Sequence, residues 1–297
     1  MRVNPNFTPT ILNDLWQSQA QEQTAIQQLA TGKRVNMPSD DPGAAAADVQ
    51  NKALQAQTDQ YLQNTSNLEG MLQTADSALS SVVTALNQAI SLGVQGSNGG
   101  LSASNQQEIA QQVQALQTQI VQLGNVSYQG SYIFGGTITQ SAPFALDATQ
   151  PSGVRYNGNT GINTVDIAQG RSIQTNLPGS QIFQGAGGNV MGSLQQLVTA
   201  LQSGNVTNIG AATTQLGTAL NYISQQRVFY GSAVNQLTAN QSYLQQEQVS
   251  LQTQETSLVG VDMAKAATDL SRAQTAQSAA LAAIAKVIPQ SLLDYLK

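Results

Sequence analysis

Two rows of side chains spaced by seven residues constrain the fold of this chain more than any other feature. One row runs through a stretch without proline and comprises Leu216, Ile223, Tyr230, Leu237, Leu244, Leu251 and Leu258. A heptad row over six repeats requires a helix roughly 70 Å long, at about 1.5 Å per residue. Rows of this length exceed the needs of a compact core, and they predict a helical rod that assembles with other rods.

The other row lies in the first half of the chain and comprises Ala47, Leu54, Tyr61, Leu68, Ala75, Val82 and Ala89. From residue 68 onward it gains a companion row, Leu72, Leu79 and Leu86, which completes the seam of a helix pair. The eight prolines leave residues 43–142 and 179–288 free. Because a proline inside a helix costs about 3 kcal/mol, these two stretches are where long helices are permitted.

Local signals place the helices of the first half. The helices predicted there span residues 9–31, 42–92 and 104–124. Thr8 and Asp41 are the expected N-caps of the first two, each followed by a proline at the first helical position, and Gly32 suits the end of the first helix. Ser104, with a glutamine three residues later, is the expected capping box of the third helix.

The pattern changes to a period of two between about residues 128 and 185. Residues 164–167 and 172–177 alternate in polarity around a Gln-Gly turn, which predicts a β-hairpin, and residues 154–156 are expected to form a neighbouring strand. After this insert, helices are predicted at residues 189–203, 207–259 and 262–287, where Pro289 interrupts the last one.

This order predicts a mainly α fold, a long antiparallel helical rod or coiled-coil bundle built from the N- and C-terminal halves, with a small inserted β module. The predicted domains are terminal assembly helices at residues 1–41 and 260–297, a helical rod domain at 42–127 and 189–259, and a β-rich insert at 128–188. Folding back at the insert brings both chain ends to one pole of the rod.

The composition argues against catalysis and against nucleic-acid binding. The chain has no cysteine and no histidine, which removes disulfides, thiolate nucleophiles, the commonest general base and the commonest zinc ligands. Its net charge is −5, so the electrostatic footprint of a nucleic-acid-binding protein is missing. We therefore expect a protein that is not an enzyme and has no catalytic, cofactor-binding or metal site.

Three motifs that could suggest a site have simpler interpretations. The glycine-rich runs at 96–100 and 185–188 lack the Gly-Lys-Ser/Thr ending of a phosphate loop and are interpreted as turns. The pair Asp40–Asp41 is interpreted as a helix cap rather than a catalytic dyad or metal site. Glu247 and Glu255, eight residues apart, are expected on a solvated helix face.

Neither end of the chain predicts a membrane segment. The first residues contain no apolar stretch of 7–15 residues typical of a secretory leader, and the apolar stretch 279–288 is far shorter than the roughly 20 residues that cross a bilayer. The terminal helices do differ from the long ones, because their apolar content is thinner and the predicted topology leaves little to cover them. Helices of this kind are marginal alone, so intermolecular packing is favoured there.

Several motifs carry a resemblance to a known family. Residues 29–36 (LATGKRVN), followed by Pro38-Ser39-Asp40-Asp41-Pro42, resemble the amino-terminal signature of the bacterial flagellin family. The Asp-Asp-Pro ending and the sequence GSYIFGG at 130–136 are similar to the hook-associated junction members of that family rather than to its filament subunits. Arg227, Gly231 and residues 235–237 match a pattern common to both groups, and the ending SLLDYL at 291–296 is similar to the junction members.

This resemblance implies an extracellular structural protein at the hook–filament junction of the flagellum. Its implied partners are neighbouring copies of itself, the first hook-associated protein, flagellin and a cytoplasmic export chaperone. Export would use the flagellar type III apparatus without a cleaved signal peptide. We expect no nucleic-acid and no membrane partner.

The expected subunit interface lies in the terminal helices and in the connector at residues 33–42. Its expected residues are Leu12, Leu15, Trp16, Ile26, Leu29, Lys33, Arg34, Asp40, Asp41, Leu270, Leu281, Ile284, Val287, Ile288 and Leu292. We expect residues 1–40 and 260–297 to be largely disordered in the free monomer and to fold against neighbours, since ordering each residue costs about 1–2 kcal/mol that packing must offset.

Three interpretations of the function stay open at this point. The first is the junction adaptor, and the second is a flagellin-type filament subunit, which would polymerise into long filaments when pure. The third is a helical translocator that enters membranes, which liposome binding by the C-terminal segment would support. An enzyme carried by the short insert is disfavoured by the missing His and Cys.

Overall fold

The computed structural model describes residues 7–293, with the side chains of residues 7–9, 11 and 286–293 outside that description. The chain forms two compact units. Unit 1 comprises residues Met1–Gln57 and Gln246–Lys297, and unit 2 comprises Thr58–Gln245. The predicted mainly α fold with long helices and a small strand module is confirmed, whereas the three-part division into domains stays a prediction.

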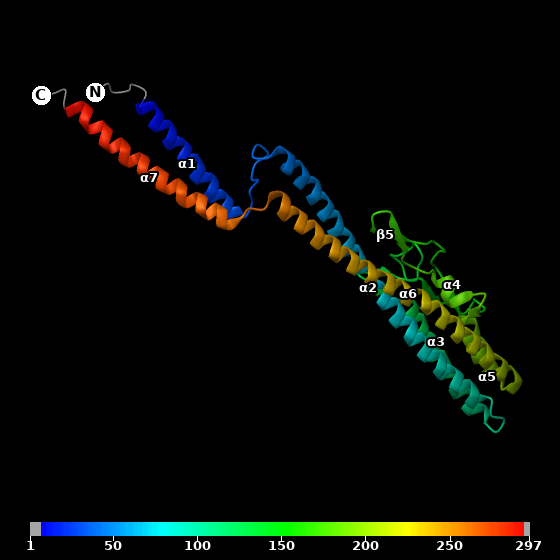
Figure 1. The fold of residues 1–297 in the computed structure, drawn as a ribbon. Coiled ribbons are helices and arrows are strands. Elements are labelled where there is room, and N and C mark those ends of the chain that lie inside the picture. Colours follow the sequence, from blue (N-terminus) through cyan, green and yellow to red (C-terminus); the bar gives the residue numbers. More distant parts are fainter. Residues whose placement is uncertain (1–6, 294–297) are drawn as a thin grey trace. The chain divides into compact units, whose positions relative to one another are not determined.

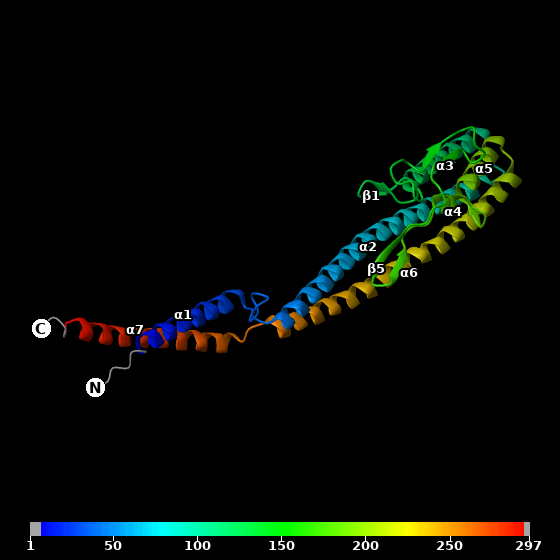
Figure 2. The ribbon, with the colours of Figure 1, turned by 90° about the horizontal axis from the view of Figure 1, so that it is seen from above.

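Unit 1 consists of two antiparallel helices and the ends of two longer ones. Helix α1 (Phe7–Thr31) lies beside α7 (Met263–Leu293) in both views (Figures 1 and 2). The unit also takes the beginning of α2 (Pro42–Gly96) and the end of α6 (Val206–Val259). The Asn51 side-chain amide donates to the Leu251 carbonyl over 2.8 Å, which joins these two helix ends.

Unit 2 contains the remainder of α2 and α6, which also run antiparallel. Arg227 on α6 forms a two-pronged ion pair with Asp76 on α2, through contacts of 2.8 and 3.0 Å. Helices α3 (Ala103–Gly124) and α5 (Val190–Ser203) pack on each other beside this pair (Figure 2). The result is a bundle in which short helices cover the seam of two long ones.

Both predicted heptad rows occur at this seam. On α6 the members of the heptad row from Leu216 to Leu251 are buried, and Leu258 is half-buried. On α2 the row is buried from Leu68 onward, but Leu54 is 41% exposed. The main hydrophobic core lies entirely between Leu68 and Leu237, within unit 2.

The insert forms three separate two-stranded antiparallel sheets, with the following elements. The sheets pair β1 (Ser127–Tyr128) with β2 (Ser131–Tyr132), β3 (Phe144–Leu146) with β4 (Val154–Tyr156), and β5 (Thr164–Ala168) with β6 (Arg171–Gln174). The short helix α4 (Gly179–Gln184) and strand β7 (Gly188–Asn189) follow them in the chain. The predicted hairpin is confirmed by the β5–β6 pair, in which Val165 lies opposite Ile173.

The predicted strand at residues 154–156 exists, but its expected position beside the hairpin is wrong. It pairs with β3, where Phe144 lies opposite Tyr156. The Asn125 side chain at the end of α3 both accepts from the Phe144 amide and donates to the Phe144 carbonyl, each over 2.8 Å. This double hydrogen bond places Phe144 of β3 in the core, and β4 lies beside β3 because the two strands pair.

An aromatic cluster attaches the insert to α6. Phe134 and Phe183 are fully buried with ring centroids 5.6 Å apart in edge-to-face geometry, and Phe134 meets Tyr230 in the same way at 6.5 Å. Phe144 contacts Phe183 at 5.1 Å. Edge-to-face pairs of this kind add to the stabilisation from burial alone, so the β module and the heptad row share one core.

The Gly-Gly sequence after Phe134 has a steric reason. Gly136 has φ +74°, and a Cβ atom there would meet the Asn159 side chain and its carbonyl oxygen. The glycine-rich run at 185–188 is a turn, as predicted, closed by bridges between Gln184 and Asn189 and between Gly185 and Gly188. A Cβ atom at Gly187 would meet the Tyr222 ring, so this turn packs directly on α6.

Several predicted helix boundaries are wrong by a few residues. Helix α1 begins at Phe7 rather than residue 9, and α2 continues to Gly96 because the first glycines of the turn-rich run still allow helical hydrogen bonds. The N-cap of α3 is Ser102, whose hydroxyl accepts from the Asn105 amide over 3.2 Å, instead of Ser104. Helix α7 continues through Pro289, where the proline removes a single hydrogen bond close to the helix end.

Helix α2 is the one helix in the described part of the chain that is long and apolar enough to cross a bilayer. Its apolar residues Leu72, Leu79 and Leu86 are fully buried within unit 2. A core helix of this kind passes the same length and composition test, so the finding is weak support for a membrane function.

Candidate subunit interface

The contact between α1 and α7 is built from small residues. Ser18 and Ala25 on α1 are buried and seven residues apart, and so are Ala266 and Ala273 on α7. The Ser18 hydroxyl donates to the Ala273 carbonyl over 2.9 Å, which sets the antiparallel register. Small side chains allow the two helices to approach closely, but each buries little apolar area, so the pair gains little hydrophobic stabilisation.

The large apolar residues of the same helices remain exposed. Trp16 is 67% exposed, Leu281 51%, Ile26 49% and Leu12 42%. At 100° per residue, Leu12, Trp16 and Ile26 fall within about 80° of one another on one flank of α1. The flank lies beside the small-residue contact, where α7 does not cover it.

The opposite side of the helix pair is polar. A groove of about 710 Å³ lies there, and its lining residues are Gln17, Ala20, Gln21, Thr24, Ala25 and Gln28 of α1 with Asp269 and Arg272 of α7. Leu281 and Met263, both about half exposed, lie at least about 120° around α7 from Asp269 and Arg272. The two helices therefore form a ribbon with one apolar side, which we call the apolar face (Leu12, Trp16, Ile26, Met263 and Leu281), and one amide-rich side.

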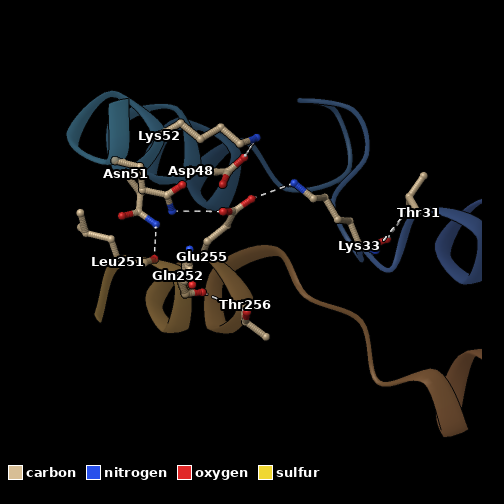
Figure 3. A network of polar contacts seen from close by, with 10 residues as sticks. Thr31, Lys33, Asp48, Asn51, Lys52, Leu251, Gln252, Glu255 and Thr256 are labelled. Atoms are coloured by element: carbon tan, nitrogen blue, oxygen red, sulfur yellow. Dashed lines mark hydrogen bonds and ion pairs between the residues drawn. The ribbon is translucent and has the colours of Figure 1, made fainter. Parts of the chain in front are cut away.

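Hydrogen bonds and an ion pair fix the connector between α1 and α2. Lys33 forms an ion pair of 2.8 Å with Glu255 on α6 (Figure 3). Gln55 donates to the other Glu255 oxygen over 3.1 Å. Backbone bonds join the connector to the segment before α7, from the Arg34 amide to the Val259 carbonyl at 2.7 Å and from the Val261 amide to the Gly32 carbonyl at 3.2 Å. These contacts set where α1 ends and where α7 begins.

Of the two adjacent aspartates, Asp41 caps the start of α2, as predicted, whereas Asp40 binds amides of the connector that precede it. Asp41 accepts from the Ala44 amide over 3.0 Å and pairs with the Arg34 guanidinium over 3.1 Å, which together lower the pKa of Asp41. Asp40 accepts from the amides of Met37 and Asn36, each over 2.9 Å, and these bonds lower its pKa. Backbone hydrogen bonds and the Arg34 contact account for both carboxylates.

The prediction that Glu255 lies on a solvated face is wrong. Glu255 is partly buried and carries the contacts of the connector, because α2 lies against this part of α6. Its position between Leu251 and Leu258 of the heptad row is the signal that could have placed it beside the seam. Glu247, eight residues before Glu255, is exposed as expected.

Acidification tests the role of Glu255. The Lys33 ammonium and the Gln55 amide hold the pKa of Glu255 below its ordinary value of 4.5. A lowered folded-state pKa means that this contribution to stability is present above about pH 4.5 and is lost as the pH falls through the lowered value. We expect the connector to loosen in that range, as measured by the NMR signal of the Arg34 amide.

The variant Glu255→Gln removes this titration and should flatten the pH dependence of the Arg34 amide signal. The pH dependence that remains should come from Asp40 and Asp41. Glu247→Gln, on the exposed face of the same helix, is the matched control and should keep the wild-type profile. An unchanged profile in Glu255→Gln would mean that the ion pair does not hold the connector.

The structure brings together some of the predicted interface residues. Arg34 and Asp41 contact each other, and Lys33 contacts Glu255 instead of a predicted residue. Among the predicted residues, Leu15, Leu29, Leu270 and Ile284 are half-buried on α1 and α7. The side chains of Val287, Ile288 and Leu292 lie outside the described residues. Sequence reasoning missed Ser18 and the small-residue contact that turns the large residues outward. The role of the predicted set in assembly stays a prediction.

Comparisons with known proteins cover both helical halves of the chain. Residues 7–139 match the bacterial flagellin N-terminal helical region, and residues 213–296 match the bacterial flagellin C-terminal helical region. Flagellar hook-associated protein 3 of Salmonella typhimurium is 28% identical over 275 residues, which are 84% of this chain and 85% of that protein. The flagellin of Listeria monocytogenes is 26% identical over 265 residues, 89% of this chain and 88% of that one.

The solved structure of Bacillus cereus FlgL has the same fold. It superposes with a TM-score of 0.60 at 22% identity, covering 70% of this chain and 99% of that chain. With both of its helical regions matched in order and the fold shared, the chain belongs to the bacterial flagellin family of flagellar structural proteins.

Proposed function

We propose that this chain is a structural junction protein of the flagellum, located outside the cell between the hook and the flagellin filament. The observation that carries the proposal is the one-sided α1–α7 ribbon, whose apolar face includes Trp16 and Leu281 exposed on the single chain. The similarity to hook-associated protein 3 over most of both chains supports the junction role. A related fold is that of the flagellar junction protein FlgL of Legionella pneumophila.

The ribbon suggests how such a protein works. Packing of the apolar face against neighbouring copies removes Trp16, Leu12 and Leu281 from water, at roughly 25 cal/mol per Å² of apolar surface. Subunits joined head-to-tail around an axis form a ring if the rotation between them closes, and an open helical array if it does not. In this proposal one end of the ring contacts the first hook-associated protein and the other receives flagellin. A cytoplasmic chaperone keeps the apolar face covered before export.

Electron microscopy of cells that lack this protein tests the junction role. We expect bare hooks and flagellin released into the medium. Normal filaments on such cells would contradict the proposal.

The second candidate function is a filament subunit, which the 26% identity with Listeria monocytogenes flagellin favours. The purified chain distinguishes the two. A junction protein forms limited assemblies, whereas a filament subunit polymerises into long filaments under the same conditions. Long filaments of the pure chain would replace the junction proposal by the filament one.

Substituting the most exposed apolar residue of the apolar face tests the interface itself. Trp16→Gln should leave the fold of the monomer unchanged, because the side chain is 67% exposed, and should weaken assembly by about 2 kcal/mol or more, as expected for a buried aromatic anchor. The matched control is Val228→Gln in unit 2, where the side chain is 68% exposed. Motility and sedimentation measure the outcome, and equal effects of the two substitutions would rule out a special role for Trp16.

A further inference from the structure

A single buried heptad row on α2 changes from polar to apolar along the helix. The row consists of Asn51, Thr58, Thr65, Leu72, Leu79 and Leu86, and every member is less than 9% exposed. The last three members belong to the main core of unit 2. Asn51 belongs to unit 1, where the contact of α2 with α6 therefore has a polar centre.

Two buried oxygens in this part of unit 1 have no donor from the protein. They are the Oδ1 atoms of Asn51 and Asp48. Asn51 is 3% exposed and Asp48 is 8% exposed. A buried acceptor without a donor loses the hydration that it has in water, and each such loss shifts an opening equilibrium by about 5- to 150-fold. Opening of the helix pair returns both oxygens to water.

The contacts that Asn51 and Glu255 make across unit 1 are polar. The Asn51 amide donates to the Leu251 carbonyl over 2.8 Å (Figure 3). Glu255 accepts from Gln55 and pairs with Lys33, whose side chain is 37% exposed. A polar contact that water can replace contributes less than the burial of a leucine side chain. Leu251 and Val259 are the buried apolar residues of α6 in this unit, and neither belongs to the main core.

We propose that residues 47–57 of α2 and 248–259 of α6 form an opening segment, in which the helix pair of unit 1 separates locally while the apolar seam of unit 2 stays closed. Regions with few buried apolar contacts and exposed polar bonds are those that open without global unfolding. The opening segment lets the two helices adjust their pairing beside the connector without disturbing the core. This inference does not depend on the junction role.

Amide hydrogen exchange of the full-length, dilute chain tests the proposal. Amides in the opening segment should exchange at least about 100-fold faster than those of residues 72–89, because the seam of the opening segment is polar whereas Leu72, Leu79 and Leu86 are fully buried in the apolar core. Equal rates in the two regions would overturn the proposal. Fraying from the helix ends also accelerates exchange, so a variant has to separate the two causes.

Asn51→Leu gives the seam an apolar residue of similar size and removes one unpaired acceptor together with the hydrogen bond to the Leu251 carbonyl. It should slow exchange of the opening segment by about tenfold, whereas fraying from the helix ends would not respond. The matched control is Gln50→Leu, which adds the same side chain on the exposed neighbouring position and should leave the rates unchanged. Equal effects of the two variants, or none in Asn51→Leu, would overturn the role of the polar seam.

The reciprocal substitution is Leu72→Asn, which extends the polar part of the row by one heptad. Provided that exchange of residues 79–89 shows the core still folded, fast exchange should spread into residues 65–79. In a chain that does not fold, the same test is made with Leu72→Thr, which matches the residue type at Thr65. Unchanged exchange around residue 72 in a folded variant would contradict the proposal.

Discussion

A chain that ends at residue 267 is expected to keep unit 2 folded and to lose assembly completely. The main core lies between residues 68 and 237, so its packing does not use α7. The truncation removes Ala273, the partner of Ser18, and Leu281 of the apolar face. Without α7, α1 has neither its small-residue contact nor the second half of the ribbon, and an isolated helix of this length is marginal in water.

Circular dichroism and thermal unfolding measure the first half of this expectation, and motility of cells that carry the truncated chain measures the second. The matched control replaces residues 268–297 by a Gly/Ser segment of equal length, which restores the chain length without an apolar face. Both variants should behave alike. Assembly of either one at the hook would show that α7 is not needed for the interface.

Phe134→Ala is expected to destabilise unit 2 by about 3–5 kcal/mol, as for other large-to-small substitutions of buried aromatic residues. The ring is fully buried and contacts Phe183 and Tyr230, so its removal leaves a cavity where the insert meets α6. The Phe134 carbonyl accepts from the Gly179 amide and from the Tyr156 hydroxyl, and these bonds hold the surroundings in place and limit collapse of the cavity. Urea denaturation of unit 2 measures the loss.

Leu146→Ala is the matched control for this substitution. It also shortens an apolar side chain in the insert, but Leu146 is 55% exposed on β3. We expect a change within about 0.5 kcal/mol, typical of surface positions. A loss in Phe134→Ala no larger than that of the control would show that the aromatic cluster does not join the insert to the long helices.

The long helices could be predicted because their signals are local and repeated. Heptad spacing, the gaps between prolines and caps such as Asp41 each depend on a few neighbouring residues, and they agree along α2 and α6. The hairpin β5–β6 was predictable for the same reason, since alternation and a turn lie within a dozen residues.

Features set by distant residues could not be predicted in this way. The partner of β4 is determined by Asn125, which fixes Phe144 from the end of α3. The contacts of Glu255 depend on Lys33, more than 200 residues away in the chain. The apolar pattern of α1 indicates which residues share a flank, but only the small-residue contact with α7 shows that Trp16 is turned outward.

The proposed assembly depends on one property of the terminal helices, namely that the α1–α7 ribbon is too weakly held to stay ordered in a single molecule. NMR order parameters of the backbone amides in residues 12–31 and 263–285, measured on the dilute full-length chain, test this most directly. We predict values below about 0.6 there, against about 0.85 in the helices of unit 2. Rigid terminal helices in the lone chain, with values equal to those of unit 2, would contradict the account.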